Sequence, residues 1–200
     1  VIPDEDDWQR ARKVAANLEV QVPSGVSLDI ETVSATIDIR GVKGEIEAGS
    51  VSGAVTVAGA SAEIEVESVS GSVKVSGGVG NVTAESVSGK VMLEGCSGDI
   101  DATTVSGQIR VEAEAATDVE IESVAGSVYF KGALGGDLEV ESHSGNVEVH
   151  LPASVVGEFS LETFSGGIDN EFGPPARRTD RYTPGLSAEF STGEDGADGS

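Results

Sequence analysis

Aromatic side chains, cysteine and basic residues are all scarce in this chain of 200 residues. Aromatic residues make up 4% of it, and there is one cysteine, Cys96. A lone cysteine excludes an internal disulfide, and so few large rings argue against a thick globular core. The 12 Lys and Arg residues stand against 35 Asp and Glu residues, giving a formal net charge of -23. Nucleic acids and anionic membrane surfaces need a positive footprint, so neither is expected as a partner.

Long apolar runs are also missing. None approaches the roughly 18 residues that a membrane-spanning helix needs, so no membrane-spanning segment is expected. The chain opens on Val1 rather than Met, which we interpret as a processed exported chain or a trimmed one. Cys96 lies in a Gly-Cys-Ser-Gly stretch, where we expect a small turn residue rather than a reactive thiol.

What the chain does contain is a repeated tetrapeptide, Ser/Thr-Val-Ser-Gly, with looser copies at both ends of the series. The copies begin at Thr32, Ser50, Ser68, Ser86, Thr104, Ser123, Ser142 and Thr163. The first four intervals are 18 residues long, and the last three are 19, 19 and 21. A fixed period of this length is typical of a solenoid, in which each repeat buries its apolar face by stacking on its neighbours.

Each repeat holds two short runs in which apolar and polar residues alternate, separated by a glycine-containing turn. In one repeat Val55 and Val57 form the first run, and Ile64 and Val66 form the second. Alternation with period two predicts strands with one buried face. We therefore predict an all-β, single-stranded β-solenoid (β-helix) of about eight coils, with two parallel sheets facing across a thin Val/Ile core.

This prediction divides the chain into three parts and places two finer features. Residues 17–172 form the solenoid, 1–16 an N-terminal cap or assembly segment, and 173–200 an extension with one further strand and an acidic tail. Leu18, Val20 and Val22, followed by Leu28 and Ile30, are interpreted as an early coil. The tetrapeptide valines are expected to fill the corner as a third internal column: Val51, Val69, Val87, Val105 and Val124.

The outward positions of the second strand in each repeat are mostly acidic. Carboxylates stacked about 4.8 Å apart repel one another by roughly 1 kcal/mol per neighbouring pair even in water. Three interpretations stay open: a solvated face, pairing with basic side chains of another molecule, or bridging by Ca²⁺ or Mg²⁺. No cofactor is required, but Ca²⁺ is a candidate ligand. The candidate metal-binding residues are Asp99, Asp101, Asp118, Glu120, Asp137 and Glu139.

Residues that would indicate catalysis are sparse. His143 takes the place of the tetrapeptide valine, and His150 lies on an outer strand face, with no Ser or Cys partner at an interpretable spacing. Paired acids such as Asp99 and Asp101 leave open a glycan-active enzyme, but the turns are too short to form a substrate cleft. We therefore expect no catalytic residues.

The two ends of the chain supply candidate assembly residues. Solenoid ends expose unpaired backbone groups that template another strand unless they are capped. A homo-oligomer or polymer is therefore expected. The residues predicted to take part are Trp8, the basic residues Arg177, Arg178 and Arg181, and the strand-like Leu186 and Phe190.

Repeats of the form Ser-Val-Ser-Gly-x-Val-x-Val-x-Gly, preceded by Val22-Pro23-Ser24-Gly25-Val26, resemble the bacterial adhesin β-strand-repeat family over residues 17–170. The resemblance implies an exported β-solenoid at the cell surface or in the cell envelope, with no established catalytic residues. We expect a non-enzymatic, extracellular or cell-envelope structural protein that self-assembles end to end into a filament or surface layer. The alternative is a monomeric envelope domain that binds divalent cations or glycans through its acidic ladder.

Overall fold

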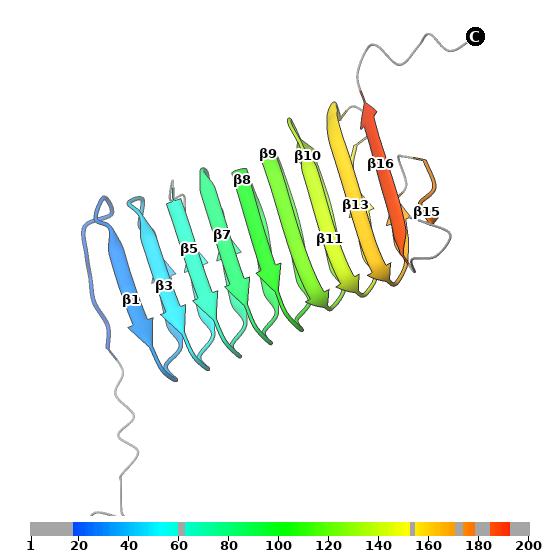
Figure 1. The fold of residues 1–200 in the computed structure, drawn as a ribbon. Coiled ribbons are helices and arrows are strands. Elements are labelled where there is room, and N and C mark those ends of the chain that lie inside the picture. Colours follow the sequence, from blue (N-terminus) through cyan, green and yellow to red (C-terminus); the bar gives the residue numbers. More distant parts are fainter. Residues whose placement is uncertain (1–17, 60–62, 153–154, 171–173, 179–184, 193–200) are drawn as a thin grey trace, which may run out of the picture.

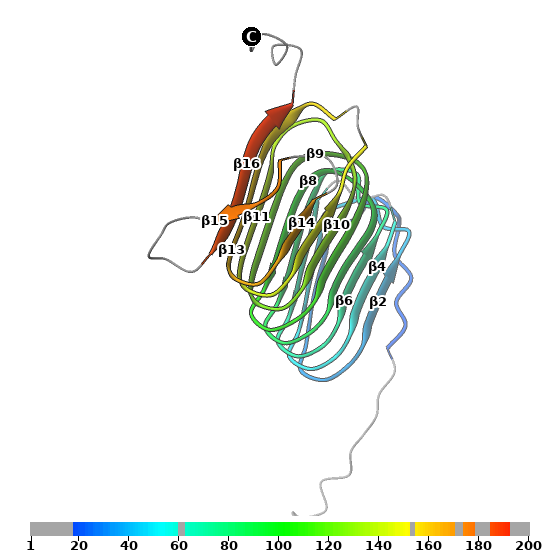
Figure 2. The same cartoon turned by 90° about the vertical axis from the view of Figure 1, so that its right-hand side faces the viewer.

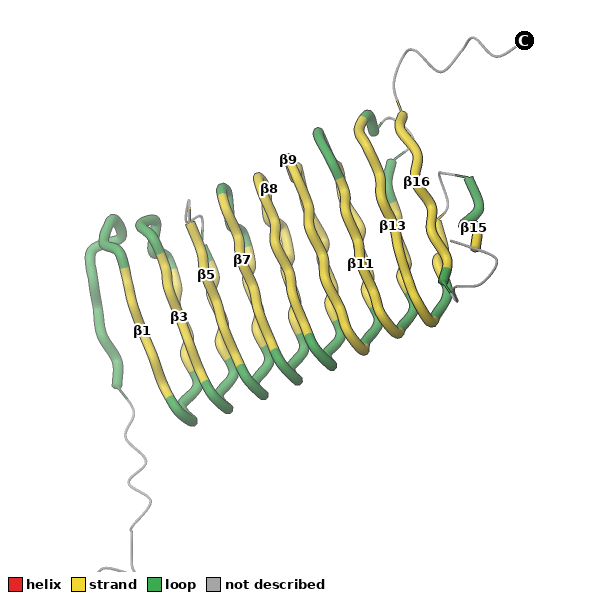
Figure 3. The backbone as a smooth tube through the Cα atoms, viewed as in Figure 1, coloured by secondary structure: helices red, strands yellow, loops and turns green. Residues whose placement is uncertain are grey.

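The fold is a β-solenoid, as predicted. The computed structural model describes residues 18–59, 63–152, 155–170, 174–178 and 185–192, and within these ranges the chain forms strands and turns without a helix. Successive coils stack side by side into an elongated body (Figures 1 and 3). Turned by 90°, the body shows two sheets facing each other, joined at the corner of every coil (Figure 2).

The strands fall into two sheets, which we call the front and back sheets. The front sheet contains, in order, β1 (Leu28–Thr32), β3 (Ile46–Ser50), β5 (Glu63–Ser68), β7 (Asn81–Ser86), β8 (Val91–Thr104), β9 (Ile109–Ala125), β11 (Leu138–Ser144), β13 (Gly157–Ser165), β16 (Leu186–Thr192) and β15 (Arg177–Arg178). The back sheet contains β2 (Ile37–Arg40), β4 (Val55–Ala58), β6 (Val73–Ser76), β10 (Val128–Leu134), β12 (Val147–His150) and β14 (Ile168–Asn170). Strands β8 and β9 run through both sheets, because each pairs with back-sheet and front-sheet neighbours.

Parallel register superposes equivalent positions of successive repeats. In the back sheet Val55 aligns with Val73, and Val73 with Val91. These side chains, and their equivalents in the front sheet, are fully or almost fully buried. Each buried Val or Ile side chain stabilises the fold by about 1.5–3 kcal/mol relative to an exposed one. The thin core is therefore stabilised by many similar, modest contributions from single side chains.

The corner of each coil differs from the prediction in one respect. The tetrapeptide valines do not form an internal column, since Val69 is 47% and Val87 44% exposed. The first residue of the tetrapeptide is buried instead, as at Ser68 and Ser86. Its hydroxyl oxygen accepts a hydrogen bond from the amide of the tetrapeptide glycine, at 2.9 Å between Ser68 and Gly71. At the corners that make this bond a Ser or Thr is favoured at the inward position, because its hydroxyl satisfies a buried amide that a valine could not.

The expected early coil differs from the prediction as well. The segment 18–27 contains no strand, so Leu18, Val20 and Val22 do not complete an early coil. Leu18 is 88% and Val20 65% exposed. The chain turns at Pro23, whose carbonyl accepts the amide of Val26 at 3.3 Å, before β1 begins. Proline has no amide hydrogen to donate to a ladder, which disfavours a strand at this point.

The end of the solenoid carries the extra strand that the sequence predicts. Strand β16 pairs with β13, but it runs antiparallel to it, whereas the preceding coils are parallel. Phe190 stacks on Phe159 with 5.1 Å between ring centroids, and Ala188 is buried. The front sheet is thus covered at this end by a segment of its own chain (Figure 1).

Candidate functional site

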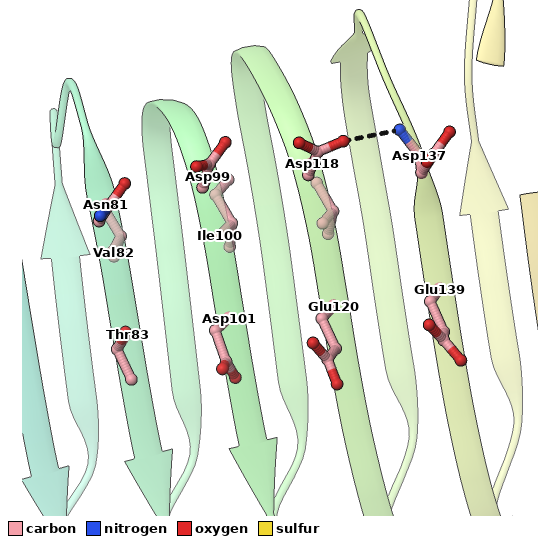
Figure 4. Close-up of a pocket in the computed structure, with 11 residues that line it drawn as sticks. Asn81, Val82, Thr83, Asp99, Ile100, Asp101, Asp118, Glu120, Asp137 and Glu139 are labelled. Carbon is pink, nitrogen blue, oxygen red and sulfur yellow. Dashed lines mark hydrogen bonds between the residues drawn. The ribbon is translucent and has the colours of Figure 1, made fainter. Parts of the chain in front are cut away.

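The acidic residues form rows along the outer surface of the front sheet. Register places Asp101, Glu120 and Glu139 in one row, one residue per coil. A second row lies nearer the start of the same strands and contains Asp99, Asp118 and Asp137 (Figure 4). The backbone amide of Asp137 donates to Oδ1 of Asp118 at 3.1 Å, which ties adjacent coils together.

The six predicted metal-binding residues therefore lie together, but as two parallel rows. All six line one shallow hollow of about 400 Å³. Among the described residues, no three His, Cys, Asp or Glu side chains converge as a metal site would require. Binding of a cation here stays a prediction.

Crowding of like charges affects the protonation of this surface. The pKa of Glu120 is raised, first by the charge of Asp101 and then by burial and neighbouring glutamates. The pKa of Glu47 is raised in the same way, with Asp29 as the largest cause. The outer surface of the front sheet thus carries many neighbouring carboxylates that repel one another.

The back sheet is different, because several of its basic side chains are paired with acids. Nζ of Lys74 lies 2.8 Å from Oε2 of Glu94, which belongs to the neighbouring coil. Arg110 pairs with Glu112 and lies over the ring of Tyr129, 4.1 Å from its centroid. Pairing neutralises local charge on the back, so the excess negative charge is concentrated on the front.

The two histidines contact their surroundings in ways that a structural role explains. His143 stacks on Phe164 with ring centroids 4.8 Å apart and planes 4° from parallel. Nε2 of His150 lies 2.6 Å from Oε1 of Glu148. The structure brings neither histidine to the acidic hollow, whose lining residues all come from the front sheet.

Of the predicted assembly residues, Trp8 and Arg181 lie outside the described residues. Arg177 and Arg178 form β15, are exposed, and pair with Ser187 and Leu186 of β16. Leu186 and Phe190 belong to β16, which contacts its own solenoid. Their part in assembly stays a prediction.

The feature that the sequence interpretation missed is a groove along the corner of the coils, which we call the valine groove. One wall is the exposed tetrapeptide column, consisting of Val51, Val69, Val87, Val105, Val124, His143 and Phe164. The other wall is the last outward position of each front strand, with Glu67, Glu85, Thr103, Glu122, Glu141 and Glu162. The alternation of inward and outward positions along the strand indicates this groove. Ile64, Val66 and Ser68 point inward, so Val69 points outward.

The comparisons with known proteins give one family. The family model described as Toastrack DUF4097 matches residues 61–175, more than half of the chain. The chain belongs to the Toastrack DUF4097 family. The match confirms that the chain is a β-repeat domain, as the resemblance of the repeats implies, and the function of this family is unknown. No curated protein and no solved structure gives a significant match. Among the described residues of this Toastrack domain, no helix is long and apolar enough to cross a membrane.

Proposed function

We propose that this Toastrack domain is a non-enzymatic structural module of the bacterial cell envelope that associates end to end through its first coil. One observation carries the proposal: the two ends of the front sheet are unlike. Its C-terminal end is covered by β16, whereas its N-terminal end presents β1 as an edge strand. In the back sheet the terminal strands β2 and β14 each pair with a single neighbour among the described strands.

The covered end resists further stacking. Strand β16 pairs with β13 from Gly157↔Thr192 to Thr163↔Leu186. Its antiparallel direction interrupts the parallel ladder that every earlier coil continues, so an incoming coil would meet the wrong hydrogen-bonding pattern. A filament or surface layer would require β16 to leave β13.

The open end favours pairing. Strand β1 is bonded on one side by β3, with the amide of Leu28 donating to the carbonyl of Glu45 at 2.8 Å. Because donors alternate along a parallel ladder, the amides of Asp29 and Glu31 face away from β3. Unpaired edge groups of this kind template another strand. Leu28 and Ile30 are only partly buried, so a second coil would also cover apolar surface.

These features favour pairs of solenoids joined at their first coils. The outward carboxylates of Asp29 and Glu31 would lie near those of the partner and oppose the contact. Raising the salt concentration from about 0.1 M to about 1 M shortens the Debye length from about 10 Å to about 3 Å. Association should therefore strengthen with salt.

Sedimentation velocity at low and high salt tests the proposal. Glu31→Pro removes an outward amide without touching the bonds to β3, and Glu31→Gln is its matched control, since it removes the same charge and keeps the amide. We expect the wild type and Glu31→Gln to associate more as salt rises, and Glu31→Pro to stay monomeric. A wild type that is monomeric throughout, or a Glu31→Pro that associates like Glu31→Gln, would contradict it.

The remaining parts of the proposal rest on different grounds. Both histidines are engaged in stacking or ion-pair contacts, which supports a non-enzymatic role. The cell-envelope location is inferred from the adhesin-like repeats alone. Fractionation of the producing cells tests it, and recovery in the cytoplasmic fraction would overturn it.

Cation binding by the front sheet is a second candidate, favoured by the hollow that six carboxylates share. Titration calorimetry with Ca²⁺ tests it. Heat of binding together with a higher Tm, both lost in Asp101→Asn/Glu120→Gln, would support it. The absence of both effects would remove it.

A further inference from the structure

The valine groove has an apolar wall that is built into the backbone of the fold. Val51, Val69, Val87, Val105 and Val124 are between 44% and 51% exposed and follow one another coil by coil. Single exposed aliphatic residues are ordinary, but a continuous row of them marks a surface that contacts something. The corner backbone is itself laddered, since the amide of Ser70 donates to the carbonyl of Val51 at 3.0 Å and that of Ser88 to Val69 at 2.9 Å. The row is therefore held in place before any ligand arrives.

The opposite wall is acidic and runs parallel to the valines. Register aligns Glu67 with Glu85, and Glu122 with Glu141 and Glu162. The groove comprises two hollows of about 350 and about 450 Å³. Both are lined by Thr103 and Val105, so the two hollows adjoin there and follow one another along the corner.

The glutamates of the acidic wall are not neutralised by nearby basic side chains in the described part of the chain. Glu67, Glu85, Glu122 and Glu141 form no ion pair with a described basic side chain. Burial raises the pKa of Glu85, and the charge of Glu67 raises it further. The pKa of Glu141 is raised by burial and then by neighbouring glutamates. A cationic group placed between these carboxylates would relieve their repulsion.

One end of the groove has a flat aromatic surface. His143 and Phe164 stack nearly parallel there, and Phe164 is 43% exposed. Glu141 and Glu162 line the same hollow. A guanidinium group suits this place better than an ammonium group, because it stacks on an aromatic face while donating to carboxylates beside it.

We propose that the valine groove binds an extended polypeptide segment in which basic side chains alternate with aliphatic ones, with an arginine over Phe164. Successive side chains of an extended chain point to opposite sides, so alternation sends bases to the glutamate wall and aliphatic groups to the valine wall. From Val51 to Phe164 there are six coil spacings of about 4.8 Å, roughly 29 Å, which about nine extended residues cover.

The chemistry of the two walls excludes other occupants. A second copy of this chain, with a net charge of -23, would bring carboxylates against carboxylates. An anionic membrane or a nucleic acid would be repelled in the same way. A metal ion or a polyamine would satisfy the glutamates but leave the valines exposed to water.

Fluorescence anisotropy with labelled ten-residue peptides tests the proposal on the full chain. The probe alternates Arg and Val, a second peptide alternates Arg and Ser with the same charge, and a third alternates Glu and Val. We expect the Arg/Val peptide to bind at least about tenfold more tightly than the Arg/Ser peptide, which corresponds to about 1.4 kcal/mol. The Glu/Val peptide should not bind.

Three variants locate the binding. Val69→Ser/Val87→Ser/Val105→Ser truncates the middle of the apolar wall, and Glu67→Gln/Glu85→Gln/Glu122→Gln removes three charges from the acidic one. The matched control Asp101→Asn/Glu120→Gln/Glu139→Gln removes the same charge from the same sheet outside the groove. We expect each groove variant to weaken Arg/Val binding about tenfold or more, and the control to weaken it less than about threefold.

All substituted side chains point outward, and circular dichroism melting checks that each variant folds. Equal binding of the Arg/Val and Arg/Ser peptides, or equal loss in the control and the groove variants, would show attraction to general negative charge and overturn the proposal. Absence of Arg/Val binding would overturn it as well. These outcomes do not depend on end-to-end association, which Glu31→Pro tests separately.

Discussion

The amide of Gly71 donates a 2.9 Å hydrogen bond to the hydroxyl oxygen of Ser68, and this contact defines the corner of the coil. The same pair recurs as Gly53 with Ser50 and Gly89 with Ser86. At the later corners the glycine amides donate to backbone carbonyls instead, as Gly126 does to Ser144 at 3.0 Å. The hydroxyls of Ser123 and Ser142 have no hydrogen-bond partner among the described residues.

This difference predicts opposite effects of the same substitution. Ser68→Ala leaves the amide of Gly71 buried and unpaired, so it should lower the free energy of unfolding by about 1–3 kcal/mol. Ser142→Ala removes a buried hydroxyl that lacks a partner, so it should be neutral or stabilising. Urea denaturation of both variants measures this. Equal losses in the two would show that the hydrogen bond is not what the corner serine contributes.

Tetrapeptide glycines should be intolerant of any side chain. A Cβ added at Gly89 would lie 1.7 Å from the carbonyl oxygen of Gly71 in the preceding coil, and backbone cannot move aside cheaply. We expect Gly89→Ala to cost about 3 kcal/mol or more, or to prevent folding. Gly49→Ala is the matched control, since its Cβ would meet nothing closer than Cγ of Glu31 at 3.9 Å. It should be neutral or mildly stabilising, and a severe loss there would contradict the explanation.

Mild acid should stabilise the fold. The carboxyl pKa values of Glu85, Glu120 and Glu141 are raised above the ordinary value of 4.5. The folded state therefore binds protons more tightly than the unfolded chain, and stability rises as pH falls from neutral through the raised values. The gain is complete once the pH is below about 4.5. The pKa of Asp38 is lowered by the hydrogen bond from Arg40, so its opposing effect begins only near and below its ordinary value of 3.8.

Thermal melting between pH 7 and pH 4.5 measures this effect. The wild type should show a higher Tm at the acid end, and Glu85→Gln should gain less because one of the responding groups is gone. A Tm that falls steadily over this range would contradict the assignment of repulsion to the front sheet.

Cys96 should be inert until the solenoid opens. Its side chain is fully buried in the core, and burial is the main reason that the pKa of its thiol is raised. A buried, protonated thiol is a poor nucleophile. A maleimide reagent should label Cys96 slowly in the native protein and rapidly in denaturant. Fast labelling of the native state would show local opening around β8.

Much of the fold could be predicted from the sequence, because the stacking of coils depends on a period that is visible in the chain. Alternation of Val55 and Val57, and of Ile64 and Val66, identifies strands with one buried face. The extra strand at Leu186 follows from the same alternation. Its antiparallel direction does not, because the direction of a terminal strand depends on the path of the preceding loop rather than on the pattern within the strand.

The expectation for the corner is wrong because it follows hydrophobicity rather than the alternation of the strand. Val69 is apolar and Ser68 is polar, yet the strand's alternation sends Ser68 inward, where it satisfies an amide. The valine groove is missed for the same reason, since a valine column inside the core would leave no apolar wall on the surface. The two rows of acids were found correctly from their positions, but whether they bind a cation depends on convergence of side chains, which a linear pattern does not specify.

The central claim of this account is that the tetrapeptide valines face outward along a rigid corner. Thiol accessibility tests it most directly, by placing a single cysteine at the corner or in the adjacent strand of a Cys96→Ala background. Val87→Cys should react with a maleimide nearly as fast as the denatured chain, whereas Ala84→Cys, at a fully buried position of β7, should be protected. Protection of Val87→Cys to the same degree as Ala84→Cys would contradict the account.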